Sequence, residues 1–284
     1  MKSRKYSEIC GAKIRARFGL RRDGISRLTL AALAISTASL TTGSGSAQSA
    51  SATPAVSDTP EQAHSGPTPY PVEPKDWPGK GAIRVFPFMN DNRKWFWSER
   101  ERKQGSVVFA GDSLIGNWRS MAQDLPGIPI ANRGIGGEFT RVLLFRFKED
   151  VLDLHPKAIV LLTGTNDLSA KQDIQLSRGN IIEMLDMAKR DAPGVPVVLC
   201  TLPPRDNPQS PVDPRQLVEL NKLIRSLPQG RTQVKVLDLY ALLAGPDGSL
   251  HADYFAADKL HLSPAGYSRF RDSLAPLLKR FKSG

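Results

Sequence analysis

The sequence predicts an α/β fold with one parallel sheet of five strands covered by helices on both faces. Beyond residue 105, short apolar runs alternate with longer amphipathic segments, without an internal repeat. Strands that alternate with helices in this way pair in parallel through right-handed crossovers, which place helices on the two faces of the sheet. About 200 residues suffice for one domain of this kind with a sizeable core.

The individual elements follow from the period of the apolar residues. The short apolar runs that we expect to form strands are residues 107–110, 128–131, 158–163, 195–201 and 234–239. The amphipathic stretches that we expect to form helices are residues 114–125, 138–154, 174–191 and 214–227. Ser263 and Pro264, an N-cap residue and a first-turn proline, predict a last helix that runs to about residue 281.

Residues 1–52 have the order of a secretory signal peptide. Residues 1–27 are basic, residues 28–42 are mildly apolar, and small residues follow through Ala52. The apolar stretch is shorter than the roughly 20 residues that a membrane span needs, so we expect cleavage after Ala47 or Ala52 and no permanent membrane anchor. The adjacent Arg21 and Arg22 are compatible with twin-arginine export, although the general secretory route stays open. We expect a periplasmic or secreted protein.

Residues 53–81 hold seven prolines and little apolar periodicity, which predicts a disordered linker ahead of a catalytic domain at residues 82–284. Residues 91–103 mix charged and aromatic side chains. They predict a surface helix with its aromatic side chains packed inward, or alternatively a wall of the substrate cleft.

Charge and cysteine content limit the expected partners and disulfides of the protein. Most of the net charge of +11 belongs to residues 1–52, and about +4 remains after cleavage. This balance gives no strong electrostatic case for nucleic acid or an anionic membrane as a partner. Cys10 leaves with the signal peptide, so Cys200 has no intrachain disulfide partner. Because Cys200 ends an apolar run, we expect a buried structural thiol.

Four short polar blocks predict a single functional site. Their sequences are Gly-Asp-Ser-Leu at 111–114, Asn-Arg-Gly-Ile-Gly-Gly at 132–137, Gly-Thr-Asn-Asp at 164–167 and Asp-Lys-Leu-His at 258–261. The first three follow expected strands, and the last precedes the start of the final helix. Because the carboxyl ends of parallel strands meet at one edge of a sheet, we expect these blocks to converge.

The blocks contain the groups that a serine nucleophile requires. Ser113 lies at an expected helix start, where free backbone N–H groups favour negative charge, but its hydroxyl needs a base. His261 has Asp258 three residues earlier, a spacing that lets the carboxylate orient the imidazole. His251 has only Asp253, two residues later, and is the weaker candidate.

Acyl transfer also needs hydrogen-bond donors for the developing oxyanion. The backbone N–H groups of Ser113 and Gly137 and the side-chain amide of Asn166 are the candidates. Singly, each block is more often a turn or a helix cap, and it is their order and strand-end placement that indicates a site. The glycine block also suggests a dinucleotide-binding loop, but Phe139 stands where such a loop has its last glycine. No P-loop or zinc-binding motif is present, and we expect no cofactor or metal.

Together the blocks resemble those of the SGNH hydrolases, also called the GDSL esterases and lipases. The resemblance covers about residues 82–282, and residues 132–141 are similar to the branch that contains the platelet-activating-factor acetylhydrolase catalytic subunits. Glu138 departs from that branch, which more often has aspartate there. The resemblance implies a flavodoxin-like three-layer α/β/α sandwich with an open cleft. It also implies Ser113 as nucleophile, His261 as base with Asp258 as its partner, and Ser113, Gly137 and Asn166 as oxyanion donors.

The resemblance implies hydrolysis of carboxylic esters of lipids, carbohydrates or small alcohols. Because no long apolar insertion is available as a lid, we expect a short acyl group. A lysophospholipase or thioesterase of the same family is an alternative, as is a non-catalytic carbohydrate- or lipid-binding protein on the same scaffold. Residues 203–208 are expected to form a rim of the cleft. We expect Arg133, Arg141 and Arg205 to be solvated surface charges, or alternatively to orient an anionic or polyhydroxylated substrate. The oligomeric state stays open.

Overall fold

The structure is a computed structural model that describes residues 65–281. The expected signal peptide at 1–52 and residues 53–64 of the expected linker lie outside the described residues. Within the described residues, no helix is both long and apolar enough to cross a membrane.

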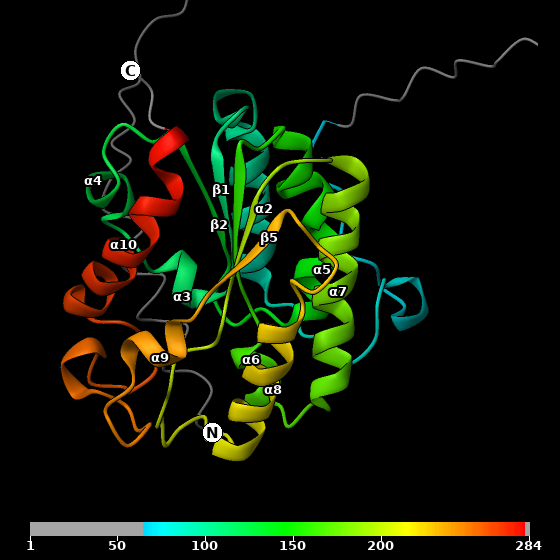
Figure 1. The fold of residues 1–284 in the computed structure, drawn as a ribbon. Helices are drawn as coiled ribbons and strands as arrows, with labels where there is room; N and C mark the ends of the chain where they lie inside the picture. Colours follow the sequence, from blue (N-terminus) through cyan, green and yellow to red (C-terminus); the bar gives the residue numbers. More distant parts are fainter. Residues whose placement is uncertain (1–64, 282–284) are drawn as a thin grey trace, which may run out of the picture. The chain divides into compact units, whose positions relative to one another are not determined.

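The expected five-stranded parallel sheet is confirmed, with the strand order β2-β1-β3-β4-β5 (Figure 1). The strands are β1 (Val107–Gly111), β2 (Ile130–Gly134), β3 (Ala158–Leu162), β4 (Val197–Cys200) and β5 (Val234–Leu237). Every residue of β1 and β3 is buried, because these central strands are covered on both faces.

Helices cover both faces of the sheet and complete the expected three-layer α/β/α sandwich (Figure 1). One side carries α3 (Ser113–Gly116), α4 (Met121–Asp124) and α10 (Pro264–Leu278). The other carries α5 (Thr140–Asp150), α7 (Ile174–Asp191) and α8 (Pro214–Ser226), and α2 (Pro87–Glu99) packs on α5. The short helices α6 (Thr165–Ser169) and α9 (Leu239–Leu243) follow the ends of β3 and β5.

Single 3-10 turns complete the chain: η2 (Pro74–Asp76), η3 (Glu101–Lys103), η4 (Leu152–Leu154), η5 (Ala252–Tyr254) and η6 (Lys279–Phe281). The helix expected at 174–191 has the bounds that the pattern predicts. The last helix begins as expected, because the Ser263 hydroxyl accepts a bond from the Gly266 N–H at 3.1 Å and Pro264 occupies the first turn.

The single helix expected at 114–125 is instead two short helices, α3 and α4. The first ends at Gly116, which lies so close to strand β2 that an added Cβ would be 2.9 Å from the Gly134 carbonyl oxygen. Asn117 then closes the turn by donating its N–H to the Ser113 and Ile115 carbonyls. Glycine and asparagine are poor helix formers, which favours the end of the helix here, and the close approach to β2 requires a glycine at position 116.

Residues 65–81, which the sequence analysis assigns to a disordered linker, pack on the domain instead. The Trp77 indole is 6% exposed and stacks on Tyr70 with ring centroids 5.5 Å apart. The Arg141 guanidinium of α5 donates to four main-chain carbonyls of this segment, those of Pro74, Trp77, Pro78 and Gly81. This part of the expectation was wrong, because a few aromatic contacts and one arginine hold a proline-rich segment in place.

Residues 91–103 form the end of α2 and turn η3. Phe96 is buried in agreement with the expected inward packing, but Trp95 is 54% exposed. Cys200 is a buried free thiol at the end of β4, as expected, and burial raises its pKa above the usual value.

Candidate active site

The carboxyl ends of three neighbouring strands lie in register and bring the expected site residues to one edge of the sheet. Gly111 at the end of β1 pairs with Gly134 of β2 and with Leu162 of β3. A Cβ on Gly111 would be 2.0 Å from the Leu162 carbonyl oxygen, so only glycine fits between these strands. Because β1 ends at Gly111 and α3 begins at Ser113, Ser113 lies at the carboxyl end of β1.

His261 lies in hydrogen-bond contact with both Ser113 and Asp258. His261 Nε2 is 2.9 Å from Ser113 Oγ, and His261 Nδ1 is 2.6 Å from Asp258 Oδ2. The serine and the histidine are 148 residues apart in the sequence. A hydroxyl, an imidazole and a carboxylate in this order have the chemistry that a serine nucleophile, its base and an orienting carboxylate require.

A tight turn fixes the Asp258 carboxylate beside the imidazole. Asp258 Oδ1 accepts the N–H groups of Leu260 and His261, each at 3.0 Å, while Lys259 has a left-handed φ of +54°. Burial acts to raise the pKa of Asp258, but the bonds from the His261 side chain and from these two N–H groups outweigh it and hold the pKa below its usual value. The carboxylate is therefore ionised across the physiological range.

The loop at 203–208 supports this turn from the side of β4. The Asn207 amide donates to the Asp258 carbonyl oxygen at 2.8 Å, and the Asp206 N–H donates to the Lys259 carbonyl at 3.0 Å. On the other side, the Tyr267 hydroxyl of α10 donates to the Leu114 carbonyl of α3 at 3.0 Å. These bonds fix the turn at 258–261 relative to α3, the helix that begins with Ser113.

The candidate oxyanion donors lie beside Ser113. An added Cβ on Gly136 would be 3.7 Å from Ser113 Cβ, and Gly137 has a φ of +76°, which glycine adopts without strain. Asn166 Nδ2 donates to the Glu138 carbonyl at 3.2 Å. The backbone N–H groups of Ser113 and Gly137 are the other two candidate donors for an anionic oxygen.

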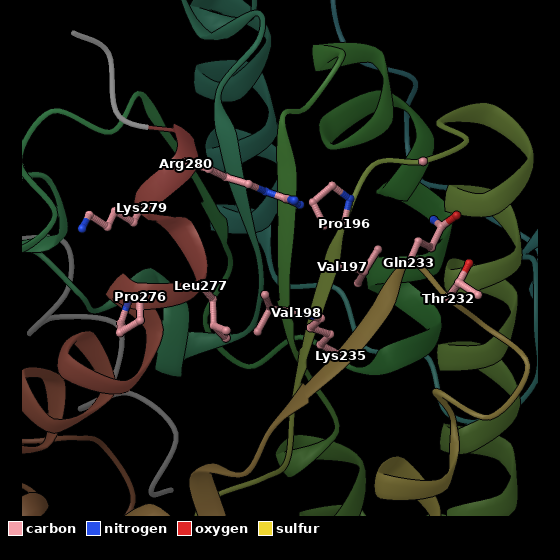
Figure 2. A pocket seen from close by; sticks show the side chains of 11 residues that line it. Pro196, Val197, Val198, Thr232, Gln233, Lys235, Pro276, Leu277, Lys279 and Arg280 are labelled. Atoms are coloured by element: carbon pink, nitrogen blue, oxygen red, sulfur yellow. The ribbon is translucent and has the colours of Figure 1, made fainter.

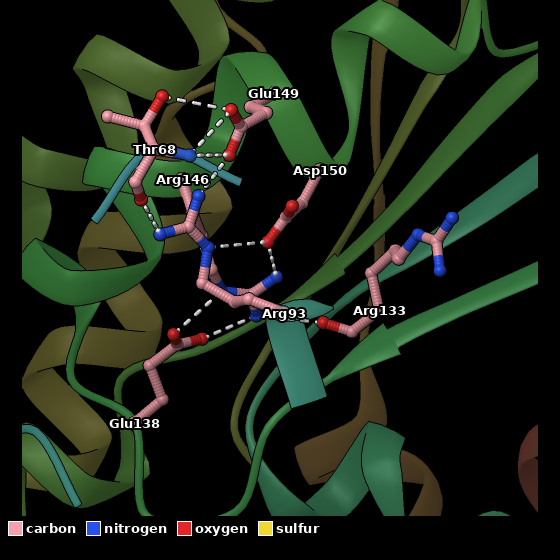
Figure 3. Close-up of polar contacts among 7 residues, drawn as sticks. All are labelled: Thr68, Arg93, Arg133, Glu138, Arg146, Glu149 and Asp150. Carbon is pink, nitrogen blue, oxygen red and sulfur yellow. Dashed lines mark hydrogen bonds and ion pairs between the residues drawn. The ribbon is translucent and has the colours of Figure 1, made fainter. Parts of the chain in front are cut away.

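Arg84 and Arg146, which no sequence motif indicates, hold the glycine turn, and Asp167 of the polar block at 164–167 holds the start of α5. Arg84 Nη2 donates to the Gly137 carbonyl at 2.6 Å. The Arg146 guanidinium binds the Glu138 carboxylate through Nε at 2.7 Å and Nη2 at 2.6 Å, and Nη2 also reaches the Arg133 carbonyl (Figure 3). Asp167 accepts the Thr140 N–H at the start of α5. Sequence spacing alone gives little sign of these contacts.

Glu138 belongs to a buried cluster of charges between α2 and α5 (Figure 3). Its buried members are Arg93, Arg133, Arg146, Glu138 and Asp150, and the half-buried Glu149 pairs with Arg93 at its margin. Burial raises the pKa of Glu138 to about 6, although the neighbouring Arg146 opposes the shift. The aspartate-to-glutamate departure noted in the sequence thus places a longer carboxylate against Arg146.

Asp112 is fully buried next to Ser113. Its Oδ1 caps α3 by accepting the Leu114 N–H at 2.9 Å, and its Oδ2 has no hydrogen-bond partner among the described residues. Burial raises its pKa to about 7, and the backbone bond from Leu114 opposes that shift.

The three arginines considered for substrate binding have structural contacts, and the expectation of solvated surface charge was wrong for them. Arg133 is 1% exposed and lies over the Phe96 ring at 4.7 Å. Arg141 binds the segment at 74–81, as described above. Arg205 is 8% exposed and donates to the main chain of Thr165 and Ser210. His251, the weaker candidate base, stacks on Tyr254.

No group of three or more metal-binding side chains occurs among residues 65–281. A cavity of about 740 Å³ lies at the amino-terminal ends of β4 and β5, whereas Ser113 lies at the carboxyl ends of the strands (Figure 2). Val197, Lys235 and Arg280 contribute to its lining, and none of the candidate site residues does. The site at Ser113 is thus separate from this cavity.

A family model and the curated relatives both match the chain to acylhydrolases. The model of the GDSL-like lipase/acylhydrolase family matches residues 103–269. The chain is 29% identical over 185 residues to the platelet-activating factor acetylhydrolase IB subunit alpha2 of Rattus norvegicus, a match that covers 62% of this chain and 77% of that protein.

Solved structures show the same fold. A GDSL-like lipase from Bacteroides thetaiotaomicron is 25% identical with a TM-score of 0.59, and the match covers 66% of this chain and 97% of the other. An acetylxylan esterase from Geobacillus stearothermophilus is 19% identical with a TM-score of 0.50, covering 64% of this chain and 97% of that one. At this identity the second likeness concerns the fold alone.

Proposed function

Because the chain belongs to the GDSL-like lipase/acylhydrolase family and is thus an ester hydrolase, we propose that it is an exported serine esterase using Ser113, His261 and Asp258. The observation that carries this proposal is the continuous contact from Ser113 Oγ through the His261 ring to the Asp258 carboxylate. A hydroxyl, an imidazole and a carboxylate in this order supply a nucleophile, a proton acceptor and a group that stabilises the imidazolium.

In the proposed cycle, Ser113 Oγ attacks the ester carbonyl while His261 Nε2 takes its proton. The carbonyl oxygen becomes an oxyanion and binds the N–H groups of Ser113 and Gly137 and the second amide proton of Asn166. The tetrahedral intermediate collapses, His261 returns the proton to the leaving alcohol, and an acyl-enzyme remains. Water then repeats the sequence and releases the acid. No step needs a cofactor.

The proposed substrate is a short-chain acyl ester of a carbohydrate, a lipid or a small alcohol. Two comparisons support an ester substrate, since one relative is named an acetylhydrolase and residues 103–269 match an acylhydrolase family. The absence of a long apolar insertion from the sequence also favours a short acyl group over a long one.

Export rests on the amino-terminal sequence, where basic residues precede a mildly apolar stretch and a run of small residues. The mature enzyme is proposed to begin near residue 48 or 53, in the periplasm or outside the cell. Amino-terminal sequencing of the protein recovered from those compartments tests this, and a chain that still carries Cys10 would contradict it.

Replacement of the nucleophile tests the proposed reaction. We expect Ser113→Ala to abolish release of p-nitrophenol from p-nitrophenyl acetate, and wild type but not the variant to react with a fluorophosphonate probe. Ser98→Ala removes a hydroxyl from the surface of α2 and serves as the matched control with full activity. Unchanged ester hydrolysis by a folded Ser113→Ala variant would remove Ser113 from the mechanism. Absence of both hydrolysis and labelling in wild type would instead favour the non-catalytic binding protein.

A further inference from the structure

Two phenylalanines expose their rings just before and within the first turn of α2. Phe86 and Phe88 are 39% and 45% exposed, and their rings stack with centroids 5.6 Å apart and planes at 15°. Only five large apolar side chains are this exposed among the described residues, and the other three are Val72, Trp95 and Val218. An exposed and ordered aromatic pair is a favourable surface for an apolar ligand.

The pair lies next to the glycine turn that borders Ser113. An added Cβ on Gly136 would be 3.7 Å from Ser113 Cβ, and one on Gly137 would be 3.4 Å from Phe86 Cε2. Gly136 and Gly137 thus lie between Ser113 and the Phe86 ring. A substituent on a carbonyl carbon held at Ser113 reaches the rings by crossing these glycines, which have no side chains to obstruct it.

Neighbouring contacts hold Phe86 in place. The Arg84 guanidinium, which donates to the Gly137 carbonyl, lies 5.3 Å from the Phe86 ring centroid and 4.2 Å from that of Phe139. The Phe86 carbonyl accepts the N–H of the buried Met89 at 2.9 Å. Because the surface is already ordered, a ligand pays little conformational entropy to use it.

The geometry of the proposed reaction indicates which part of an ester meets the rings. The leaving alcohol must take its proton from His261, which precedes α10, and α10 lies on the opposite side of the sheet from α5, on which α2 packs (Figure 1). The carbonyl oxygen is directed at the oxyanion donors. The acyl chain is the remaining substituent, and it is free to extend over Gly136 and Gly137 toward Phe86.

We propose that Phe86 and Phe88 form an acyl-binding subsite that accepts an unbranched apolar acyl chain longer than acetyl, such as butyryl or hexanoyl. This inference rests on the proposed esterase function and specifies its substrate. The first methylene groups beyond acetyl lie over the glycine turn and Phe86, and the next reach Phe88. An acetyl group is too short to gain from the rings.

A chain-length series on purified protein tests the subsite. For wild type, we expect kcat/KM for p-nitrophenyl esters to rise about two- to fourfold for each methylene group from acetate to hexanoate, the factor that burial of a methylene supplies. Phe86→Ala and Phe88→Ala should flatten this rise, whereas Phe88→Leu, which keeps an apolar side chain, should retain most of it. A rise that survives in both alanine variants would overturn the subsite.

Trp95→Ala is the matched control, because Trp95 is an exposed aromatic residue on the same helix, two turns beyond Phe88 and about 10 Å along the helix axis. We expect it to leave the chain-length series unchanged. An equal flattening by Trp95→Ala would overturn the local subsite in favour of a general apolar docking face. If wild type hydrolyses no ester at all, the esterase proposal fails, whereas hydrolysis without dependence on chain length contradicts the subsite alone.

Discussion

The side-chain amide of Asn166 donates to the carbonyl oxygen of Glu138 across 3.2 Å. This bond joins the segment after β3 to the glycine turn after β2, so that two of the candidate oxyanion donors, Asn166 and Gly137, are held as one unit. The amide retains a second N–H for an oxyanion. A change that displaces Glu138 should therefore displace both donors together.

We expect Glu138→Gln to lower both stability and kcat. The change leaves the buried Arg146 guanidinium without its bidentate carboxylate, and breaking a buried ion pair costs about 3 kcal/mol of the free energy of unfolding. The loosened turn should lower kcat about tenfold with little change in KM, because the oxyanion bonds form only during the reaction. Urea unfolding and steady-state kinetics measure the two effects.

Glu138→Asp and Arg215→Gln are the comparisons for this prediction. The aspartate keeps the charge on a side chain shorter by one methylene group and should recover part of kcat. Arg215 forms an exposed pair with Asp213, so its replacement should change stability by less than about 1 kcal/mol. Full kcat in a folded Glu138→Gln enzyme would show that the pair stabilises the domain without positioning the oxyanion donors.

Because Asp112 is buried, we expect its contribution to the stability of the folded protein to fall as pH rises. Burial raises its pKa from the usual 3.8 to about 7, so between these values the folded chain holds a proton that the unfolded chain has released. The contribution of Asp112 to the free energy of unfolding should decrease from about pH 4 to about pH 7 and then level off. Glu138 acts in the same direction between 4.5 and about 6.

Carboxylates with lowered pKa values, such as Asp258, change stability with pH in the opposite direction. The effect of Asp112 is therefore measured as the difference in the free energy of unfolding between wild type and Asp112→Asn. Denaturant unfolding of wild type and Asp112→Asn at a series of pH values measures it. The stability of wild type relative to the variant should decline across pH 4 to 7. Asp91→Asn on the surface of α2 is the control, and an equal pH slope in wild type and Asp112→Asn would contradict the prediction.

The sequence predicted the parts of the fold and the site that depend on local pattern. All five strands lie within or beside the expected apolar runs, and the polar blocks at their ends converge because parallel strands share one carboxyl edge. Ser113, His261 and Asp258 could be predicted as candidate catalytic residues because a serine at a helix start and an Asp-x-x-His segment together are typical of a serine nucleophile with its base. Their hydrogen bonds then follow from the fold.

The contacts that support the site could not be predicted because they join residues far apart in the chain. Arg84 reaches Gly137 across 53 positions and Asp167 reaches Thr140 across 27, with no periodic pattern to reveal either pair. Arginines that look like surface charge in the sequence are buried by contacts of the same kind. Composition likewise fails for residues 65–81, since their order depends on Arg141 and on Phe145 of α5.

We expect Arg141→Lys to loosen the segment at 65–81. The guanidinium donates to four main-chain carbonyls, and a lysine ammonium at the same place cannot span them. The free energy of unfolding should fall by about 1–2 kcal/mol, and limited proteolysis should cut within 65–81 faster than in wild type. Arg190→Lys, a surface change near the end of α7, is the control. Equal cleavage rates in Arg141→Lys and wild type would show that the aromatic contacts alone hold the segment.

Gly137→Ala should impair catalysis beyond its effect on stability. Gly137 has a φ of +76°, which alanine adopts only with strain, so we expect the turn that presents the Gly137 N–H to shift, although the new Cβ would make only ordinary contact with Phe86 Cε2 at 3.4 Å. Gly194 is a matched control, because its φ of +81° is similar and an added Cβ meets nothing within 4 Å. Both alanine variants should lose about 1 kcal/mol of stability from the left-handed backbone. Only Gly137→Ala should lower kcat, by about tenfold or more, as expected when an oxyanion donor is displaced. Equal kcat values in the two variants, measured below their melting temperatures, would exclude the Gly137 N–H as a donor.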